Sequence, residues 1–264
     1  MTTVLAGLLI ALAAASGPDG RLSADKSSGT IGADSGALTR EQVVAALGTA
    51  TDQKPANFAG HDLSGLDLSG LDFHKANLSH CRLVRTKFAH AKMFAASLDS
   101  AIAREADFSN AVLDIAVMRG TDASHASFRG ASLYAVIVFG ANFTDADFTD
   151  ARVILAGAGA TFVRAKFAHA NAGADPGNQP MGLMRADFTG ADFTGADLAD
   201  ANFRKVKLTR ANLTGADLTN TDLTLAELDG TILRSIKGRT SIRGLDKAKH
   251  LDDAVFDSTS AAKQ

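Results

Sequence analysis

A five-residue period runs through most of this chain and restricts its fold more than any other feature. Residues 141–151 read ANFTDADFTDA, so Ala, then Asn or Asp, then Phe and Thr return after five residues. An α-helix repeats its faces every 3.6 residues and a strand every 2 residues, so neither element alone accounts for the period. The period therefore indicates a larger repeating unit.

The repeating unit has an apolar residue at its centre. Every fifth residue from Phe58 to Ala158 is apolar, and most of these centres are Leu, Phe or Met. Two positions before most centres stands Ala, with Cys81 and Thr86 as small substitutes, and one position before stands mostly Asp or Asn. The pattern returns at Phe188 and continues to Leu233, so the repeat region spans residues 55–235.

This pattern resembles the A-(D/N)-(L/F)-x-x signature of the pentapeptide-repeat family over residues 56–235. The resemblance implies an all-β solenoid: a right-handed quadrilateral parallel β-helix with four units per coil, in which the small residue and the centre face inward. Ordering five residues costs roughly 5–10 kcal/mol of backbone entropy, whereas burying one Leu or Phe returns about 1.5–3 kcal/mol. A single unit therefore cannot fold alone, and stability must come from stacking many coils.

Four units per coil predict that residues 20 apart stack, with Phe88, Phe108, Phe128 and Phe148 in one column. A spacing of 15 also pairs Phe residues, so this column alone does not fix the number of units per coil. After Ala158 the next centre follows four residues later, and sixteen residues then separate two further centres. We predict that this deletion and insertion cancel. The column then continues through Phe167 to Phe188 in coils of 19 and 21 residues, with residues 172–185 forming a bulged corner and no projecting loop.

The two ends of the repeat region need covers, because an open coil exposes a sheet edge. Residues 38–54 are predicted to form an N-terminal capping helix, since Thr39 and Gln42 make a capping-box pattern. Residues 236–264 are predicted to form a C-terminal capping helix and tail, because apolar residues recur there at helical spacing: Ile242, Leu245, Ala248, Leu251 and Val255.

The first 37 residues differ in composition from the repeat region. Residues 4–15 read VLAGLLIALAAA, an apolar run that ends in small residues before Ser16, which is typical of a signal peptide. No Lys or Arg precedes the run, so the alternatives are a different true start or a retained hydrophobic helix. We predict a signal peptide at residues 1–15 and a flexible linker at residues 16–37. The protein is then periplasmic or secreted, without a transmembrane helix in the mature chain, and it is cytoplasmic if the segment is retained.

The polar residues give little sign of catalysis or of cofactor binding. The single cysteine, Cys81, excludes an internal disulfide, and no two His residues have metal-ligand spacing on a helix. We therefore expect no enzyme activity, cofactor or metal. His125 has a structural explanation, because residues on its face alternate in charge along a predicted ladder: Arg85, Glu105, His125, Asp145 and Arg164.

Two basic clusters and one apolar cluster are the candidate surfaces. The basic clusters are either solvated surface or sites for phosphate, polysaccharide or an acidic partner, and they comprise Lys75, Arg82, Arg85, Lys87 and Lys92, and Arg204, Lys205, Lys207 and Arg210. Apolar residues at outward positions predict a patch larger than a soluble monomer usually exposes. A partner, a second copy, the linker or a cap could cover it, or the register could be displaced. Its residues are Phe94, Val112, Ile115, Val117, Tyr134, Ile137, Phe139, Ile154 and Leu155.

The sequence favours a non-enzymatic scaffold that binds a protein partner or forms a homodimer. The resemblance offers an alternative, because the best-known family members resemble B-DNA, bind DNA gyrase and protect it from quinolones. Against this, residues 56–235 hold 17 basic and 20 acidic residues, far from the charge density of a duplex. The short corner predicted at residues 172–185 also leaves no room for long gyrase-contacting loops. We expect no direct nucleic-acid binding.

Overall fold

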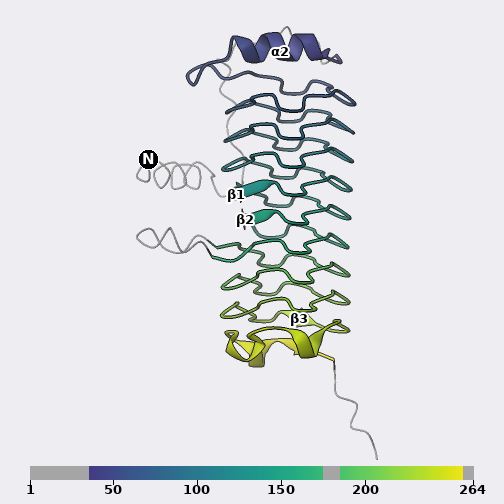
Figure 1. Ribbon diagram of the computed structural model, residues 1–264, viewed down its shortest axis with the longest axis vertical. Helices are drawn as coiled ribbons and strands as arrows, with labels where there is room; N and C mark the ends of the chain where they lie inside the picture. The colour runs from purple at the N-terminus through teal and green to yellow at the C-terminus, as the bar shows by residue number, and fades with distance from the viewer. Residues whose placement is uncertain (1–35, 175–184, 258–264) are drawn as a thin grey trace, which may run out of the picture.

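The computed structural model describes residues 36–174 and 185–257, and the structural statements below refer to these residues. The chain forms a stack of coils with one α-helix, α2, across the end nearest the N-terminus (Figure 1). The predicted signal peptide and most of the predicted linker lie outside the described residues. The regular elements are α2 Arg40–Gly48, β1 Ser132–Ile137, β2 Arg152–Ala156, β3 Ile232–Leu233 and β4 Val255–Phe256, with short 3-10 helices at Arg239–Ser241, Leu245–Lys247 and Leu251–Asp253.

Parallel pairing joins residues 20 apart along four sides of the stack, as predicted. We name each side by the first repeat residue that pairs on it: the Asn57, Asp62, Asp67 and Asp72 sides, which continue through Asn77, Arg82, Lys87 and Lys92. An inner coil is hydrogen-bonded to both of its neighbours, because the Asn77 amide donates to the Ala56 carbonyl of the coil before and the Leu78 amide donates to the Ser97 carbonyl of the coil after. The four ladders show that each regular coil contains four five-residue units.

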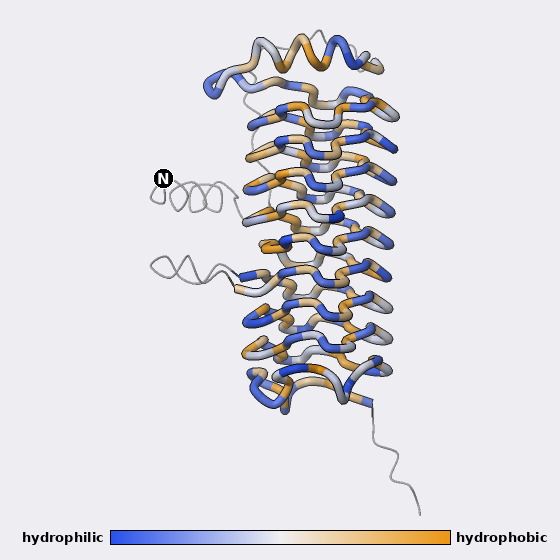
Figure 2. The backbone as a smooth tube through the Cα atoms, viewed as in Figure 1, coloured by the Kyte–Doolittle hydropathy of each residue, from blue (hydrophilic) through white to orange (hydrophobic). Residues whose placement is uncertain are grey.

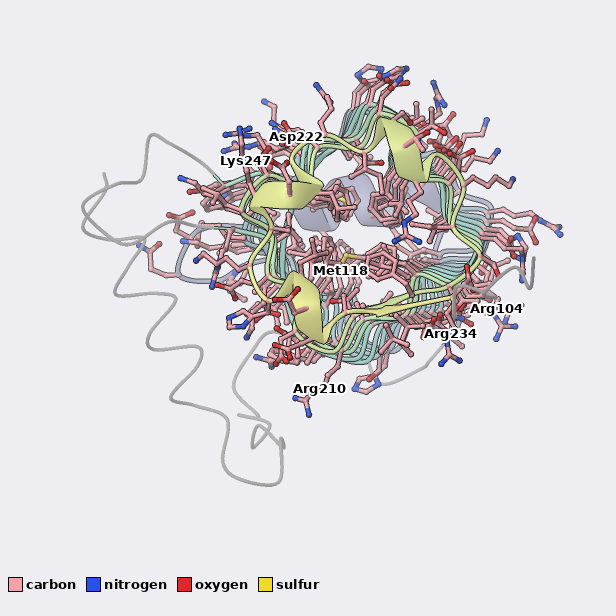
Figure 3. The ribbon with its side chains drawn as sticks, turned by 90° about the horizontal axis from the view of Figure 1, so that it is seen from below. Arg104, Met118, Arg210, Asp222, Arg234 and Lys247 are labelled. Carbon is pink, nitrogen blue, oxygen red and sulfur yellow. The ribbon has the colours of Figure 1, made fainter. Side chains whose placement is uncertain are left out.

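The core consists of the predicted inward positions. Figure 3 shows Met118 inside the coils, whereas Arg104, Arg210 and Arg234 point outward. The rings of Phe108 and Phe128 stack in parallel with centroids 4.9 Å apart, and those of Phe128 and Phe148 do the same. The 20-residue column is therefore confirmed. Figure 2 shows hydrophobic and hydrophilic residues alternating along the coils, as inward and outward positions do.

The corners explain the preference for Asp or Asn before each centre. At each corner the centre's carbonyl accepts a backbone hydrogen bond from the residue three positions later, as Phe58 does from His61. The carboxylate of Asp62 accepts a hydrogen bond from the Ser64 amide at 2.8 Å, and equivalent bonds recur in unit after unit. The Asp or Asn side chain thus stabilises the turn through an Asx-type bond. The repeat pattern predicts only that this side chain faces solvent, so the turn bond is an additional role.

The predicted 19-residue coil is confirmed, because Asp147 pairs with Lys166 and Phe148 stacks on Phe167. The predicted place of the deletion and the predicted register beyond Ala172 are wrong. Tyr134 pairs with Ile154 but Val136 pairs with Leu155, so the one-residue deletion lies within β2. Pairing then runs from Ala156 to Asp187, a step of 31 residues and eleven more than a regular coil. The predicted 21-residue coil and bulged corner are therefore wrong. Lys166 pairs with Asp197, so Phe167 lies opposite Leu198. Phe188 lies on a different side of the stack. Residues 175–184 of the inserted segment lie outside the described residues.

The two covers differ in kind. At the N-terminal end, α2 begins with the predicted capping box, in which Thr39 and Gln42 exchange hydrogen bonds. At the other end, the predicted capping helix is replaced by one more coil with six-residue units, since Lys237, Arg243 and Lys249 pair with residues of the coil before. The three 3-10 helices lie at the corners of this coil, each in a unit with one extra residue (Figure 3). From Ile242 onward, each six-residue unit turns two apolar residues, three positions apart, toward the core. Apolar residues therefore recur every three residues, which resembles the i, i+3 spacing of a helix and explains the error.

Candidate functional site

The predicted apolar patch spans the corner where the Asp72 side meets the Asn57 side, and its member Phe139 lies at the other end of the Asn57 side, in the turn toward the Asp62 side. Four of its nine residues are buried, so their predicted exposure is wrong: Ile115, Val117, Ile154 and Leu155. Two are well exposed, Val112 at 40% and Phe139 at 52% of their surface. Three more are half-buried. We call the five residues that keep exposed surface the apolar corner: Phe94, Val112, Tyr134, Ile137 and Phe139.

The burial of Leu155 follows from the deletion in β2. Leu155 occupies the inward position that Ala fills in most units, and Gly157 occupies the following centre. Leu155 is thus larger than the usual Ala at its position, and Gly157 is smaller than the usual Leu or Phe at the following centre. Together the two residues keep the interior filled. The Gly157 backbone has φ +149°, and a Cβ there would lie 2.7 Å from the Phe139 nitrogen. Gly157 therefore allows the close backbone approach beneath Phe139.

Aromatic and charged groups surround the apolar corner. The Arg152 guanidinium lies 4.2 Å from the centroid of the Tyr134 ring. The His74 ring stacks on Phe94 at 5.4 Å and also lies 3.3 Å from the Asp52 carboxylate. An apolar centre with aromatic residues and a polar margin is the composition of many protein interfaces.

Ile115 is an unusual residue for its place in the turn, where it has the φ of about +60° that recurs at this position in other units. β-Branched residues rarely adopt positive φ, and such strain persists only where the surrounding structure holds it. The next two coils provide β1 and β2, which are the longest strands among the described residues. This corner thus differs from the regular turns both in sequence and in backbone form.

The predicted charge ladder containing His125 is confirmed as a set of ion pairs. Arg85 donates to Glu105 at 2.8 Å, His125 lies 3.8 Å from Asp145, and Arg164 donates to both Asp145 oxygens. The hydrogen bonds from Arg164 hold the pKa of Asp145 below its ordinary value, against a smaller opposing effect of burial. The pairs are exposed to solvent, so each contributes little stability on its own.

The first basic cluster is largely neutralised by acids of other coils. Asp62 faces Arg82 at 3.7 Å, Asp67 faces Lys87 at 3.9 Å, and Asp52 lies 3.2 Å from Lys75. Because most of these basic side chains form ion pairs, this cluster is not a strongly positive surface.

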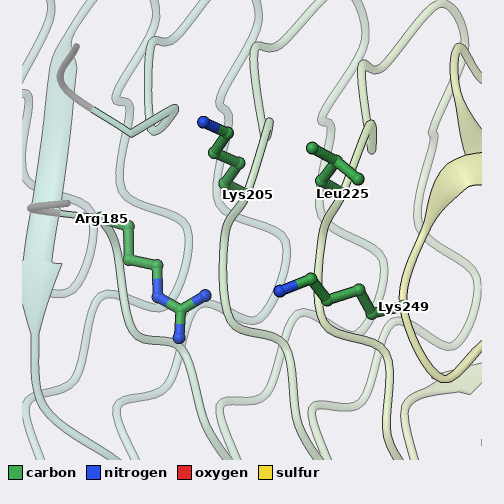
Figure 4. Close-up of a pocket in the computed structure, with 4 residues that line it drawn as sticks. All are labelled: Arg185, Lys205, Leu225 and Lys249. Atoms are coloured by element: carbon green, nitrogen blue, oxygen red, sulfur yellow. The ribbon is translucent and has the colours of Figure 1, made fainter.

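The second basic cluster divides in a similar way, but part of it lies at a groove. Arg204 pairs with Asp222 and Lys207 with Asp187, whereas Lys205 has no ion pair among the residues that the structure describes. Lys205 lines a groove of about 290 Å³ together with Arg185, Leu225 and Lys249 (Figure 4). Sequence reasoning could not identify this groove, because bringing Arg185 and Lys249 together depends on the 31-residue coil and on the six-residue units.

The structure offers no support for metal or thiol chemistry within residues 36–174 and 185–257. No group of three or more His, Cys, Asp or Glu residues there is placed to hold a metal ion. The Cys81 thiol is buried and donates to the Phe58 carbonyl, and burial raises the pKa of Cys81 to about 12. It therefore stays a neutral thiol, and its role matches that of Thr86, whose hydroxyl donates to the Leu63 carbonyl. No helix in the same residues is long and apolar enough to span a membrane.

Comparisons with known proteins identify the repeat. The family description "Pentapeptide repeats" matches in eight copies, over residues 56–89, 91–133, 183–220 and 196–234. A search of curated protein sequences found no match.

Solved structures of two proteins are similar to the chain. HetL, a pentapeptide repeat protein involved in heterocyst differentiation regulation from the cyanobacterium Nostoc sp. Strain PCC 7120, is 22% identical with a TM-score of 0.45, over 83% of this chain and 94% of HetL. Full-length QnrB1, a plasmid-mediated fluoroquinolone resistance protein, is 16% identical with a TM-score of 0.42, over 75% of this chain and 94% of QnrB1. Because repeat copies match on both sides of the inserted segment, the chain belongs to the pentapeptide-repeat family.

Proposed function

We propose that this protein is a non-enzymatic scaffold, a right-handed quadrilateral β-helix that binds a protein partner through the apolar corner. The observation that carries the proposal is the exposure of Phe139 and Val112 beside three half-buried apolar side chains on consecutive coils. Elsewhere the outward positions hold mostly Asp, Asn, Ser, Thr and ion pairs. Tyr and Arg, which are enriched among the residues that dominate binding energy, also meet here as Tyr134 and Arg152.

The proposal is tested with surface variants that leave the core intact. Val112→Ser combined with Phe139→Ser removes the two most exposed apolar side chains, and Ile102→Ser is the control. Ile102 is 38% exposed but lies on the Asp62 side. Sedimentation and partner recovery on the tagged full-length protein should show loss of the assembled species for the double variant alone. Unchanged mass and partner recovery would rule out the apolar corner as the interface.

Export from the cytoplasm is a second part of the proposal. It rests on the apolar run at residues 4–15 and the small residues that precede Ser16. Cell fractionation with N-terminal sequencing of the native protein tests it. A mature chain that starts at Ser16 outside the cytoplasm is the expected result, and an intact Met1 in the cytoplasm would contradict it.

The alternative function is gyrase binding by a DNA-like surface. The 31-residue coil favours this alternative more than the sequence did, because it removes the argument that no long segment interrupts the repeat. The charge argument remains, since the repeat region carries a net charge of −3, whereas a duplex of similar length carries one negative charge per about 1.7 Å. Inhibition of gyrase supercoiling when this protein and gyrase are present in equimolar amounts would support the alternative. No inhibition under these conditions would exclude it.

A further inference from the structure

We infer that the groove lined by Arg185, Lys205, Leu225 and Lys249 binds carboxylate groups of an acidic, partly apolar segment in the protein partner. This inference rests on the proposed function, because it names the chemistry of that partner. We call these four residues the basic groove.

The basic groove holds more positive than negative charge. Arg185 donates to both oxygens of Glu227, at 2.9 and 3.2 Å, and Lys249 lies 3.6 Å from the same carboxylate. In Figure 4 the charged ends of Arg185 and Lys249 point toward one another. Three cations thus face one acid, which leaves a surplus of two positive charges. Lys205 is the cation without an ion pair among the described residues.

The carboxylate of Glu227, beside the groove, is already engaged by Arg185 and Lys249. Burial alone would raise the pKa of Glu227, but the hydrogen bonds and charges of Arg185 and Lys249 outweigh burial and hold that pKa below its ordinary value. Glu227 therefore stays ionised and keeps Arg185 and Lys249 fixed beside the groove. The ammonium groups of Lys205 and Lys249 remain able to donate to a ligand.

The basic groove continues the edge on which the apolar corner lies. Pairing runs from Arg152 in β2 through Asn171 to Asn202, so Lys205 lies two coils beyond β2, about 10 Å along the stack. Leu225 is 38% exposed among the cations and extends the apolar surface into the groove. The coil between β2 and Lys205 contains residues 175–184, which lie outside the described residues. Apolar and aromatic groups before that coil and ammonium groups after it complement a segment with apolar residues followed by Asp or Glu.

A nucleic acid fits this edge less well than an acidic peptide. Phosphate backbones bind to extended rows of cations, whereas the neighbouring cations Arg204 and Lys207 are already paired with Asp222 and Asp187. The fork of Arg185, the group best suited to bidentate phosphate binding, is occupied by Glu227. The remaining isolated ammonium groups suit single carboxylates.

The test uses two rhodamine-labelled peptides of eight residues, one with four apolar residues followed by four Glu and one with the same four apolar residues followed by four Gln. Fluorescence anisotropy on the full-length protein at low ionic strength should show at least tenfold tighter binding of the Glu peptide. That preference should fall at least tenfold in Lys205→Gln/Lys249→Gln. It should persist in Lys166→Gln/Lys237→Gln, a control that removes two exposed cations from the Asp67 side.

The outcomes separate this inference from the proposed function. A preference that survives in Lys205→Gln/Lys249→Gln, or that falls equally in the control, would overturn the inference. Inorganic phosphate that binds as tightly as the Glu peptide at equal ionic strength would also overturn it. Val112→Ser/Phe139→Ser should weaken both peptides to the same extent and leave the preference intact. If that variant changes neither peptide binding nor partner recovery while the lysine variant acts as expected, the basic groove stands and the apolar-corner interface fails.

Discussion

Gly157 and Leu155 exchange the sizes that the repeat normally assigns to their positions. The centre of the unit is a glycine, and the small inward position is a leucine that lies within the core. The exchange accompanies the one-residue deletion in β2 and brings the Gly157 backbone against Phe139. At the residue scale, this pair of substitutions shapes the corner that we propose as the interface.

Gly157→Ala should destabilise the fold strongly. Its φ of +149° is strained for any L residue, and the added Cβ would lie 2.7 Å from a backbone nitrogen, so we expect a loss of about 3 kcal/mol. The control is Gly140→Ala, which has φ +65° and open space around its Cβ, and should lose about 1–2 kcal/mol. Urea unfolding followed by circular dichroism measures both, and equal losses would contradict the close approach.

Asp145 should titrate below the usual range for an aspartate. Its pKa is lowered chiefly by the hydrogen bonds from Arg164, so Arg164→Gln should raise it when the carboxyl carbon is followed by NMR. A carboxylate whose folded pKa is depressed stabilises the protein above its unfolded pKa, and this contribution is lost as pH falls through the folded value. The exposed pair should make only a small contribution. An unchanged Asp145 pKa in the variant would contradict the ladder.

At the scale of elements, the two covers were predicted with unequal success. The capping box of α2 is local chemistry, so Thr39 and Gln42 were sufficient to place the helix. The C-terminal cover was not predictable in the same way, because Ile242 and Ala248 fit both a helix and a six-residue coil. Only the pairing of Arg243 with Asp222 and of Lys249 with Glu227 distinguishes the two.

The helix α2 should protect the first coil through Val43, which is fully buried, whereas its neighbour Val44 is 39% exposed. Val43→Asp places an unpaired carboxylate in an apolar contact and should detach the helix, because burying such a charge costs several kcal/mol. The exposed sheet edge of the first coil should then favour association between molecules. Sedimentation should show association for Val43→Asp and a monodisperse species, unchanged from the wild type, for Val44→Asp. Similar behaviour of the two variants would contradict the capping role.

At the scale of the whole molecule, the sequence predicted the 20-residue stacking because the inward side chains set the period directly. The register beyond Ala158 could not be predicted by counting. The sixteen residues from Ala172 to Phe188 could be three units with one extra residue or one unit with eleven extra residues. Only the backbone pairing between coils distinguishes these two registers. The basic groove depends on that choice, since the long coil is what places Arg185 beside Glu227.

The Phe column should be essential to the stack as a whole. Phe128 is fully buried between Phe108 and Phe148, so Phe128→Asp buries an unpaired charge and should abolish folding. Phe139→Asp introduces the same side chain at the exposed corner and should change the free energy of unfolding by about 0.5 kcal/mol or less. A soluble, cooperatively folding Phe128→Asp protein would contradict the stacked core.

The central claim is that the apolar corner is the binding edge of the protein. Site-specific photo-crosslinking in cells tests it most directly, with a benzophenone amino acid placed at Phe139 and, as a control, at Lys237 on the Asp67 side. We predict a discrete crosslinked partner, or a crosslinked second copy, from position 139 and none from position 237. Crosslinks from position 237 alone, equal crosslinks from both positions, or none from position 139 would contradict the claim.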